Sequence, residues 1–376
     1  MTQPRKILSQ RLGVQERELG FNASVSRAWT GRRPSGQLGL SAMRMMRTAV
    51  LVAIGMSGMG RAESPPVNAE ALGIGLESYP YPFPVEFFPL EIEGQMVRMA
   101  YMDVHPTAAG NGQTVVLLHG KNFYGNSWEG TIRELIRAGF RVVVPDQIGF
   151  GKSSKPDIHY SFDLLAANTA RLLDSLGVKQ AAVVGHSTGG MLAVRFARTY
   201  PSRVTRLVLE DPIGLEDYRF KIPPQTLETL FKAELDQTPE KLRALYAGYF
   251  AEPKPELYER HVELASRVLT SGEYPRWAKA SALAYLMIYE QPVRHELHLL
   301  KPPVLLVVGE KDRTVVMRQY GDPEVVKTMG KYPELAEAAA RDIPDCKLVV
   351  VPATGHVPHL ERPEAFHRAL SSFLKP

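Results

Sequence analysis

Ser187 lies in the stretch GHSTG (residues 185–189), between a run of small and branched apolar residues and a segment with helical spacing. The pattern Gly-x-Ser-x-Gly predicts a tight turn from a buried strand into a helix, with the serine at its tip. Side chains larger than hydrogen at positions 185 and 189 would collide with the helix or with a neighbouring strand. A serine exposed in this way can act as a nucleophile when a base lies beside it.

Two residues far along the chain could supply that base and its acid. Asp312 follows an apolar run at 303–309, and His356 follows another at 347–352. An imidazole titrates near neutral pH, so His356 can take the serine proton and return it to a leaving group. A carboxylate at 312 can orient the ring and stabilise its charged form. Asp211, which ends the run at 204–210, is the alternative acid.

Three other histidines are open to different interpretations. His359 is the alternative to His356 as the base. His186 precedes the serine and is expected to point into the sheet. His119 is expected to hold its own loop by hydrogen bonds.

The elements that must position these residues alternate along the chain. Apolar runs predict strands at 86–93, 96–104, 114–118, 141–145, 181–185, 204–210, 303–309 and 347–352. Helical spacing predicts helices at 126–138, 161–176, 189–200, 324–340 and 362–374. This alternation predicts an α/β fold, a mostly parallel central sheet with helices on both faces.

One segment, about 215–298, interrupts the alternation because it carries helical stretches and no strand signal. It predicts an inserted helical cap over the carboxyl edge of the sheet, where open parallel sheets bind ligands. Seven of the 15 tyrosines fall between 218 and 289, together with Phe220, Phe231, Phe250 and Trp277. Some of these aromatics could line an apolar pocket, although we expect most to pack the cap helices together.

Five motifs in order give the chain a resemblance to a known family: LLHGKN (117–122), PDQIGFGKSS (145–154), GHSTG, GEKD (309–312) and GHVPHLERPEAF (355–366). From about residue 85 to 376 the chain resembles an α/β-hydrolase with a helical cap. The elbow supplies the backbone N–H of Thr188 as one donor to a developing oxyanion. The resemblance implies that the second donor lies after His119-Gly120, at the N–H of Lys121.

The identity of the nucleophile narrows the activity. Haloalkane dehalogenases and most epoxide hydrolases of the family carry aspartate at the elbow, so Ser187 favours acyl transfer to water. We expect a serine hydrolase of carboxylic esters of apolar or aromatic small molecules. A carbon–carbon bond hydrolase, an aminopeptidase and a ligand receptor without turnover are the alternatives. Lys121 and Arg313 could attract a substrate carboxylate. The aminopeptidase alternative depends on acidic residues that could bind a substrate amine: Glu216, Asp217, Glu290 and Glu296.

The positive net charge of +5 belongs to the first 62 residues. Ten Lys and Arg against Glu16 and Glu18 give that segment +8, which leaves −3 for residues 63–376. The balance predicts no nucleic-acid partner. Residues 43–62 run from basic through apolar to small, which is typical of a signal peptide cleaved after Ala62.

The order of these segments predicts an exported, periplasmic or secreted protein. An organellar transit peptide and a cytoplasmic location are the alternatives. The expected domains are a leader at 1–62, a hydrolase core at 63–214 and 299–376, and the cap at 215–298.

The remaining signals concern the cysteine, metals, the membrane and oligomeric state. The lone Cys346 begins a predicted strand and is expected to be a buried structural thiol. The HELH sequence at 295–298 lacks the spacing of a zinc peptidase, and we predict no metal and no cofactor. The apolar run at 49–56 is too short to span a bilayer. Either a monomer or a homo-oligomer is compatible with the sequence.

Overall fold

The central feature of the fold is one eight-stranded sheet. The computed structural model describes residues 70–107 and 109–375, so the leader and its signal peptide lie outside the described residues. The strands, in chain order, are β1 (Glu86–Ile92), β2 (Gln95–Val104), β3 (Thr114–Leu118), β4 (Arg141–Pro145), β5 (Ala181–His186), β6 (Val204–Glu210), β7 (Val304–Gly309) and β8 (Cys346–Val351). Each strand begins and ends within one residue of its expected bounds.

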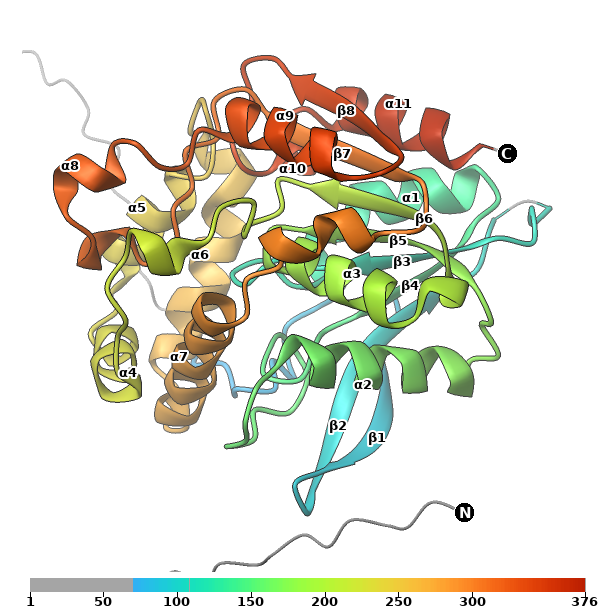
Figure 1. The fold of residues 1–376 in the computed structure, drawn as a ribbon. Helices are drawn as coiled ribbons and strands as arrows, with labels where there is room; N and C mark the ends of the chain where they lie inside the picture. The colour runs from blue at the N-terminus through green and yellow to red at the C-terminus, as the bar shows by residue number, and fades with distance from the viewer. Residues whose placement is uncertain (1–69, 108, 376) are drawn as a thin grey trace, which may run out of the picture. The chain divides into compact units, whose positions relative to one another are not determined.

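The strands are ordered β1-β2-β4-β3-β5-β6-β7-β8 across the sheet (Figure 1). The pairs β1–β2 and β2–β4 are antiparallel, and the five pairs from β4 to β8 are parallel. Because parallel strands end at the same edge, β5, β6, β7 and β8 bring their carboxyl ends together. The mostly parallel α/β sheet expected from the sequence is confirmed.

Helices cover both faces of the sheet (Figure 1). The helices of the core are α1 (Glu129–Arg137), α2 (Phe162–Ser175), α3 (Thr188–Thr199), α8 (Pro323–Val326), α9 (Tyr332–Asp342), α10 (Pro358–Glu361) and α11 (Pro363–Leu374). Alternate strand residues enter opposite layers: Val183 packs with residues of α2 and α3, whereas Val184 packs with residues of α1 and α11. Burial of both faces explains why the strands are continuous apolar runs.

Between β6 and β7 the chain forms helices and no strand. These helices are α4 (Leu227–Leu235), α5 (Pro239–Ala247), α6 (Pro255–Leu269) and α7 (Tyr274–Glu290), with 3-10 turns η3 (Tyr218–Phe220) and η4 (Arg294–Leu299) at the two ends. In Figure 1 they lie together beside one end of the sheet. Within residues 70–107 and 109–375, no helix is both long and apolar enough to cross a membrane.

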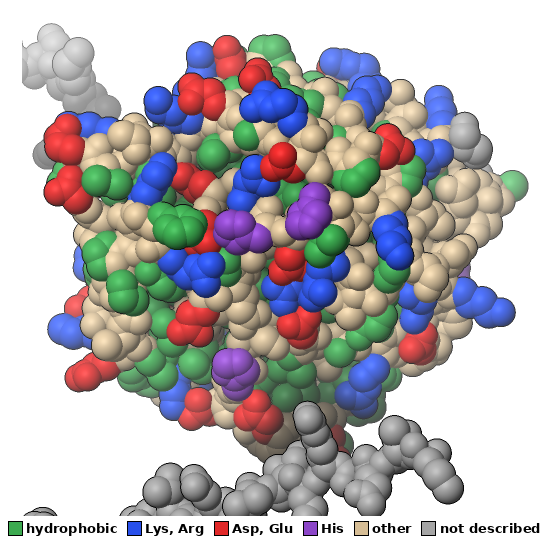
Figure 2. Space-filling model, in the orientation of Figure 1, with side chains coloured by type: hydrophobic (Ala, Val, Ile, Leu, Met, Phe, Trp, Pro, Cys, Tyr) green, Lys and Arg blue, Asp and Glu red, His purple; other side chains and the backbone are tan. Residues whose placement is uncertain are grey.

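Ion pairs join the last turn of this helical insertion to the core. The guanidinium of Arg195 in α3 donates to Glu296 of η4 at 2.6 and 3.1 Å and to Asp163 of α2 at 2.7 Å. Arg195 is itself buried. Elsewhere on the surface, acidic and basic side chains are interspersed over the face in Figure 2.

Two expectations differ from the structure. The helix expected at 324–340 is divided into α8 and α9, because Gly330 has a φ of +63° and a proline occupies the first turn of α9. Cys346 is only partly buried, since β8 is an edge strand of the sheet. Burial still raises the pKa of its thiol to about 11.

Candidate active site

The turn that carries Ser187 joins β5 directly to α3. Ser187 has φ 54° and ψ −116°, a conformation that non-glycine residues rarely adopt. A Cβ at position 185 would overlap with the carbonyl oxygen of Gly189, and a Cβ at 189 would overlap with that of Leu118 at the end of β3. The two glycines therefore permit the close packing of helix and strands that holds the serine in its strained conformation.

The structure brings Ser187, His356 and Asp312 into one hydrogen-bonded chain. His356 Nε2 lies 2.9 Å from Ser187 Oγ, and His356 Nδ1 lies 2.7 Å from Asp312 Oδ2. The three residues are 8%, 2% and 1% exposed, so water weakens neither contact by much. With Nδ1 donating to the carboxylate, Nε2 is free to accept the serine proton.

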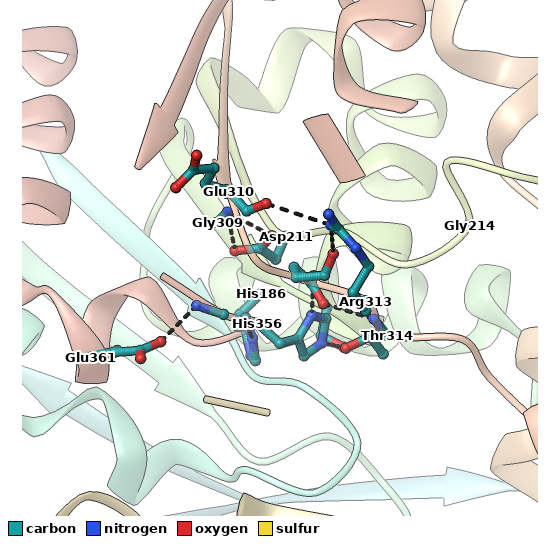
Figure 3. A network of polar contacts seen from close by, with 12 residues as sticks. His186, Asp211, Gly214, Gly309, Glu310, Arg313, Thr314, His356 and Glu361 are labelled. Atoms are coloured by element: carbon teal, nitrogen blue, oxygen red, sulfur yellow. Dashed lines mark hydrogen bonds and ion pairs between the residues drawn. The ribbon is translucent and has the colours of Figure 1, made fainter. Parts of the chain in front are cut away.

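Asp211 lies beside this chain and plays a different part. Its two carboxyl oxygens accept the N–H of Gly309 at 3.0 and 3.1 Å (Figure 3). Burial, together with the charge of Asp312, raises the pKa of Asp211 well above its usual range. Although burial alone would raise the pKa of Asp312, the charge and hydrogen bond of His356 lower it. Asp312 is therefore the ionised partner of the ring.

Hydrogen bonds to several elements hold the loop that carries His356. The N–H of His356 donates to Tyr249 O of the helical insertion at 2.7 Å, and His186 Nε2 donates to His356 O at 2.8 Å. Glu361 accepts the N–H of Gly355 at 2.6 Å with one oxygen (Figure 3). Its other oxygen accepts the N–H of Glu252 at 3.1 Å. Sequence reasoning missed Glu361 as a support, although it lies within the last of the five motifs.

The other histidines do not reach Ser187. His359 pairs with the carboxyl group of Glu210 at 3.0 Å and stacks on Trp128, with ring centroids 4.2 Å apart. His119 Nδ1 donates to Gly120 O at 2.8 Å, while its Nε2 accepts the N–H of Gln147 at 3.0 Å. His119 thus holds its loop, as expected, and burial lowers its pKa.

Two segments border the serine, the start of α3 and the loop after β3. Thr188 is the first residue of α3, and Lys121 follows Gly120 in the loop after β3. Gly120 is packed so closely that a Cβ there would lie 3.2 Å from Ser187 Cβ and 2.9 Å from His186 Nδ1. The loop backbone therefore borders the space above Ser187.

That space is a cavity of about 330 Å³, called here the catalytic cavity. Its lining includes Ser187, His356 and Lys121, and Tyr249 and Tyr285 contribute aromatic rings from the helical insertion. Most other aromatics singled out in the sequence lie elsewhere: Phe250 and Tyr258 are packed in a buried cluster, and Phe220 is 79% exposed. Phe250 and Tyr258 pack within the insertion, as expected, whereas Phe220 faces solvent.

Lys121 separates the catalytic cavity from a smaller one of about 50 Å³, which Trp277 and Tyr124 help to line. Its Nζ donates to Ser281 Oγ at 2.6 Å and lies 3.7 Å from Glu234 Oε1. It also lies 3.7 Å from the centroid of the Tyr285 ring. The positive charge of Lys121 therefore already has a carboxylate and an aromatic ring as partners within the protein.

Three of the four acidic residues that could bind a substrate amine, Glu216, Asp217 and Glu296, are paired with other groups of the protein. Glu296 pairs with Arg195, Asp217 accepts from Arg219 at 2.7 Å, and Glu216 accepts the N–H of Gly330 at 2.9 Å. Among the described residues, none of the cavity-lining side chains is a carboxylate.

One group among the described residues has the makings of a metal site: Asp211, Asp312 and His356, whose ligand atoms lie within 4.8 Å of one another. These are the side chains that already hydrogen-bond within the chain described above. A cation bound there would need one of the two ring nitrogens of His356, both of which already take part in hydrogen bonds.

The sheet topology, the strand-to-helix elbow and the Ser-His-Asp geometry define the class of protein: an α/β-hydrolase fold with a serine at its elbow. The model of the alpha/beta hydrolase family matches residues 115–369, and the chain belongs to this family of hydrolases.

Three known proteins are similar to the chain in sequence or in structure. A probable hydrolytic enzyme of Pseudomonas aeruginosa is 43% identical in sequence, and its crystal structure superposes with a TM-score of 0.80 over 82% of this chain and 99% of that one. The 2-hydroxy-6-oxo-6-phenylhexa-2,4-dienoate hydrolase of Burkholderia cepacia is 28% identical over 287 residues, 72% of this chain and 91% of that protein. A thermophilic esterase of Thermogutta terrifontis is 25% identical, with a TM-score of 0.58 over 77% of this chain and 98% of that one.

Proposed function

We propose that this hydrolase cleaves carboxylic esters of apolar or aromatic small molecules through an acyl-enzyme on Ser187. The observation that carries the proposal is the unbroken contact from Ser187 Oγ through the His356 ring to Asp312, at 2.9 and 2.7 Å. The cavity at the serine, about 330 Å³ with two tyrosine rings, supports a small substrate with an apolar part.

In the proposed reaction, His356 Nε2 takes the proton of Ser187 as the oxygen attacks the ester carbonyl carbon. The oxyanion of the tetrahedral intermediate accepts hydrogen bonds from the N–H groups of Thr188 and Lys121. His356 then gives its proton to the leaving alcohol, and the acyl group stays on Ser187. In the second half, the same ring takes a proton from water as the water oxygen attacks the acyl carbon. The bond from that carbon to Ser187 Oγ then breaks, the ring returns the proton to Oγ, and the acid leaves. Asp312 stabilises the imidazolium in both halves of the reaction.

The test is a panel of 4-nitrophenyl esters with acyl chains from two to twelve carbons, assayed with the wild type and with Ser187→Ala. We expect multiple turnovers per chain and a loss of about four orders of magnitude or more in kcat for the variant. Release of one nitrophenol per chain would instead favour a receptor that reacts once. Hydrolysis that survives in Ser187→Ala would contradict the proposal.

The second candidate is a carbon–carbon bond hydrolase, which the resemblance to the Burkholderia cepacia enzyme supports. It makes a different prediction with the same active-site residues: cleavage of 2-hydroxy-6-oxo-6-phenylhexa-2,4-dienoate and little turnover of simple esters. A kcat/KM for the dienoate at least a hundredfold above that of every ester in the panel would favour this candidate.

We also propose that the protein is exported, with cleavage after Ala62 of the basic, apolar and small segments at 43–62. N-terminal sequencing of the mature protein is expected to begin at Glu63. A mature chain that starts well before residue 55 would contradict export.

A further inference from the structure

The charged residues that line the catalytic cavity are all of one sign. Its lining holds Lys121, Arg313 and Arg318 beside His356, and among the described residues it includes no aspartate or glutamate. Lys121 is paired internally with Glu234 and covered by Tyr285. The two arginines therefore supply the positive charge that a ligand could meet.

Arg313 is held where the chain leaves β7. Its Nη1 donates to the carbonyl oxygens of Asp312 at 2.6 Å and Glu310 at 3.5 Å, as Figure 3 shows. The carboxylate of Glu310 itself accepts the N–H of Ala353 at 2.9 Å and lies 3.6 Å from Lys311. Arg313 is thus fixed through backbone oxygens, and its charge is left uncancelled by a close carboxylate.

Arg318 opens the 3-10 turn Arg318–Tyr320, directly after Met317, whose φ is +59°. Both arginines are exposed at the lining of the cavity. Within the described part of the chain, no carboxylate lies within 4.0 Å of either guanidinium. Thr314 and Gln319 add neutral hydrogen-bonding groups beside them.

A guanidinium presents a planar set of donors that matches a carboxylate, and a pair of them next to a cavity without acids favours an anion. We propose that the natural ester carries a second, negatively charged group, a carboxylate, which Arg313 and Arg318 bind while the ester carbonyl lies at Ser187. This inference rests on the ester hydrolase proposed above and names its substrate class.

The test compares matched esters that differ only in charge. Mono-4-nitrophenyl adipate and 4-nitrophenyl hexanoate have the same acyl length, and 4-acetoxybenzoate and its methyl ester place the charge on the alcohol side. We expect kcat/KM to be at least tenfold higher for the anionic member of one pair, and to fall as ionic strength rises. Uncatalysed hydrolysis is measured and subtracted for each ester.

Arg318→Gln is the principal variant, because Arg313 also bonds the backbone of Asp312. We expect Arg318→Gln to raise KM for the preferred anionic ester about three- to tenfold, to leave its kcat within about twofold, and to leave the neutral ester unchanged. Arg318→Lys is expected to retain part of the preference. Arg368→Gln, at an exposed arginine of α11 that does not line the cavity, is the matched control.

A second readout separates this inference from the proposed function. Calorimetry on Ser187→Ala, alone and combined with Arg318→Gln, measures binding of the same esters without turnover. A third protein adds Arg313→Gln to these two changes. Equal affinity for charged and neutral esters, or a preference that survives in this third protein, would overturn the inference even if esters are hydrolysed. If no ester is turned over, the proposed function fails, while the binding measurement still decides whether the arginines select an anion.

Discussion

Replacement of Asp312, the acid of the proposed triad, is the perturbation whose outcome the structure constrains most closely. Asp312 accepts the Nδ1–H of His356 at 2.7 Å, and both side chains are at most 2% exposed. An amide at 312 can present its NH₂ group to Nδ1, which favours the ring tautomer that carries its proton on Nε2. That tautomer cannot accept the proton of Ser187.

For Asp312→Asn we therefore expect kcat to fall about 10⁴-fold, which is roughly 5 kcal/mol of transition-state stabilisation. The assay is the initial rate of 4-nitrophenyl butyrate hydrolysis, with a thermal melt to show that the variant is folded. Asp211→Asn is the matched control. Burial and the neighbouring charge raise the pKa of Asp211 well above its usual range, which favours the neutral acid. An amide at 211 is also neutral and can still accept the N–H of Gly309.

We expect Asp211→Asn to stay within about tenfold of the wild-type kcat, since it loses at most one neutral hydrogen bond. The reasoning would be refuted if Asp211→Asn were as damaging as Asp312→Asn in a folded protein. It would also be refuted if Asp312→Asn kept more than a tenth of the wild-type rate, because the ring would then be oriented by another group.

Three further perturbations test the supporting structure. Gly185→Ala would place a Cβ against a backbone carbonyl, so we expect urea titration to show a loss of at least ~3 kcal/mol in the free energy of unfolding. Gly130→Ala, whose Cβ would lie in open space, is the control and is expected to cost no stability. Equal losses in the two variants would contradict the steric account of the elbow. Arg195→Met removes a buried guanidinium from two carboxylates, and we expect unfolding free energy to fall by about 1–3 kcal/mol, against no change if the pairs contribute nothing. The hydrogen bond from Arg219 lowers the pKa of Asp217 to about 2, below its unfolded value, so its contribution is present above about pH 4 and lost as pH falls through about 2. Melts of Asp217→Asn should therefore show a deficit at pH 6 that vanishes near pH 2, and a deficit independent of pH would exclude this linkage.

Much of the fold can be predicted from the sequence because buried parallel strands have a strong local signal. The runs that became β5 and β6 are continuous apolar stretches with polar or glycine residues at their ends, and both were placed to within a residue. The elbow can also be predicted from a local pattern, because only glycine allows the close approach of the backbone at positions 185 and 189. The prediction of one continuous helix at 324–340 is wrong because the apolar periodicity continues across Gly330. The positive φ of that glycine cannot be read from a pattern of apolar residues.

The candidate site could be predicted only in part, because contacts between distant segments depend on register and not on local pattern. Asp211 and Asp312 both follow strands that end at the same edge, and one atom pair, His356 Nδ1 with Asp312 Oδ2, distinguishes them. The support of the His356 loop by Glu361 and by Tyr249 O depends on how the helical insertion is placed over the core. Spacing identifies an aromatic helix but leaves open which of its rings, such as Tyr285, faces the cavity.

Covalent labelling with a fluorophosphonate, followed by peptide mapping, tests directly whether Ser187 is the nucleophile activated by His356. The account predicts one phosphonyl group per chain, attached to Ser187, with labelling lost in Ser187→Ala and slowed at least a hundredfold in His356→Ala. A label on any other residue, or a rate of labelling at Ser187 that does not depend on His356, would contradict it.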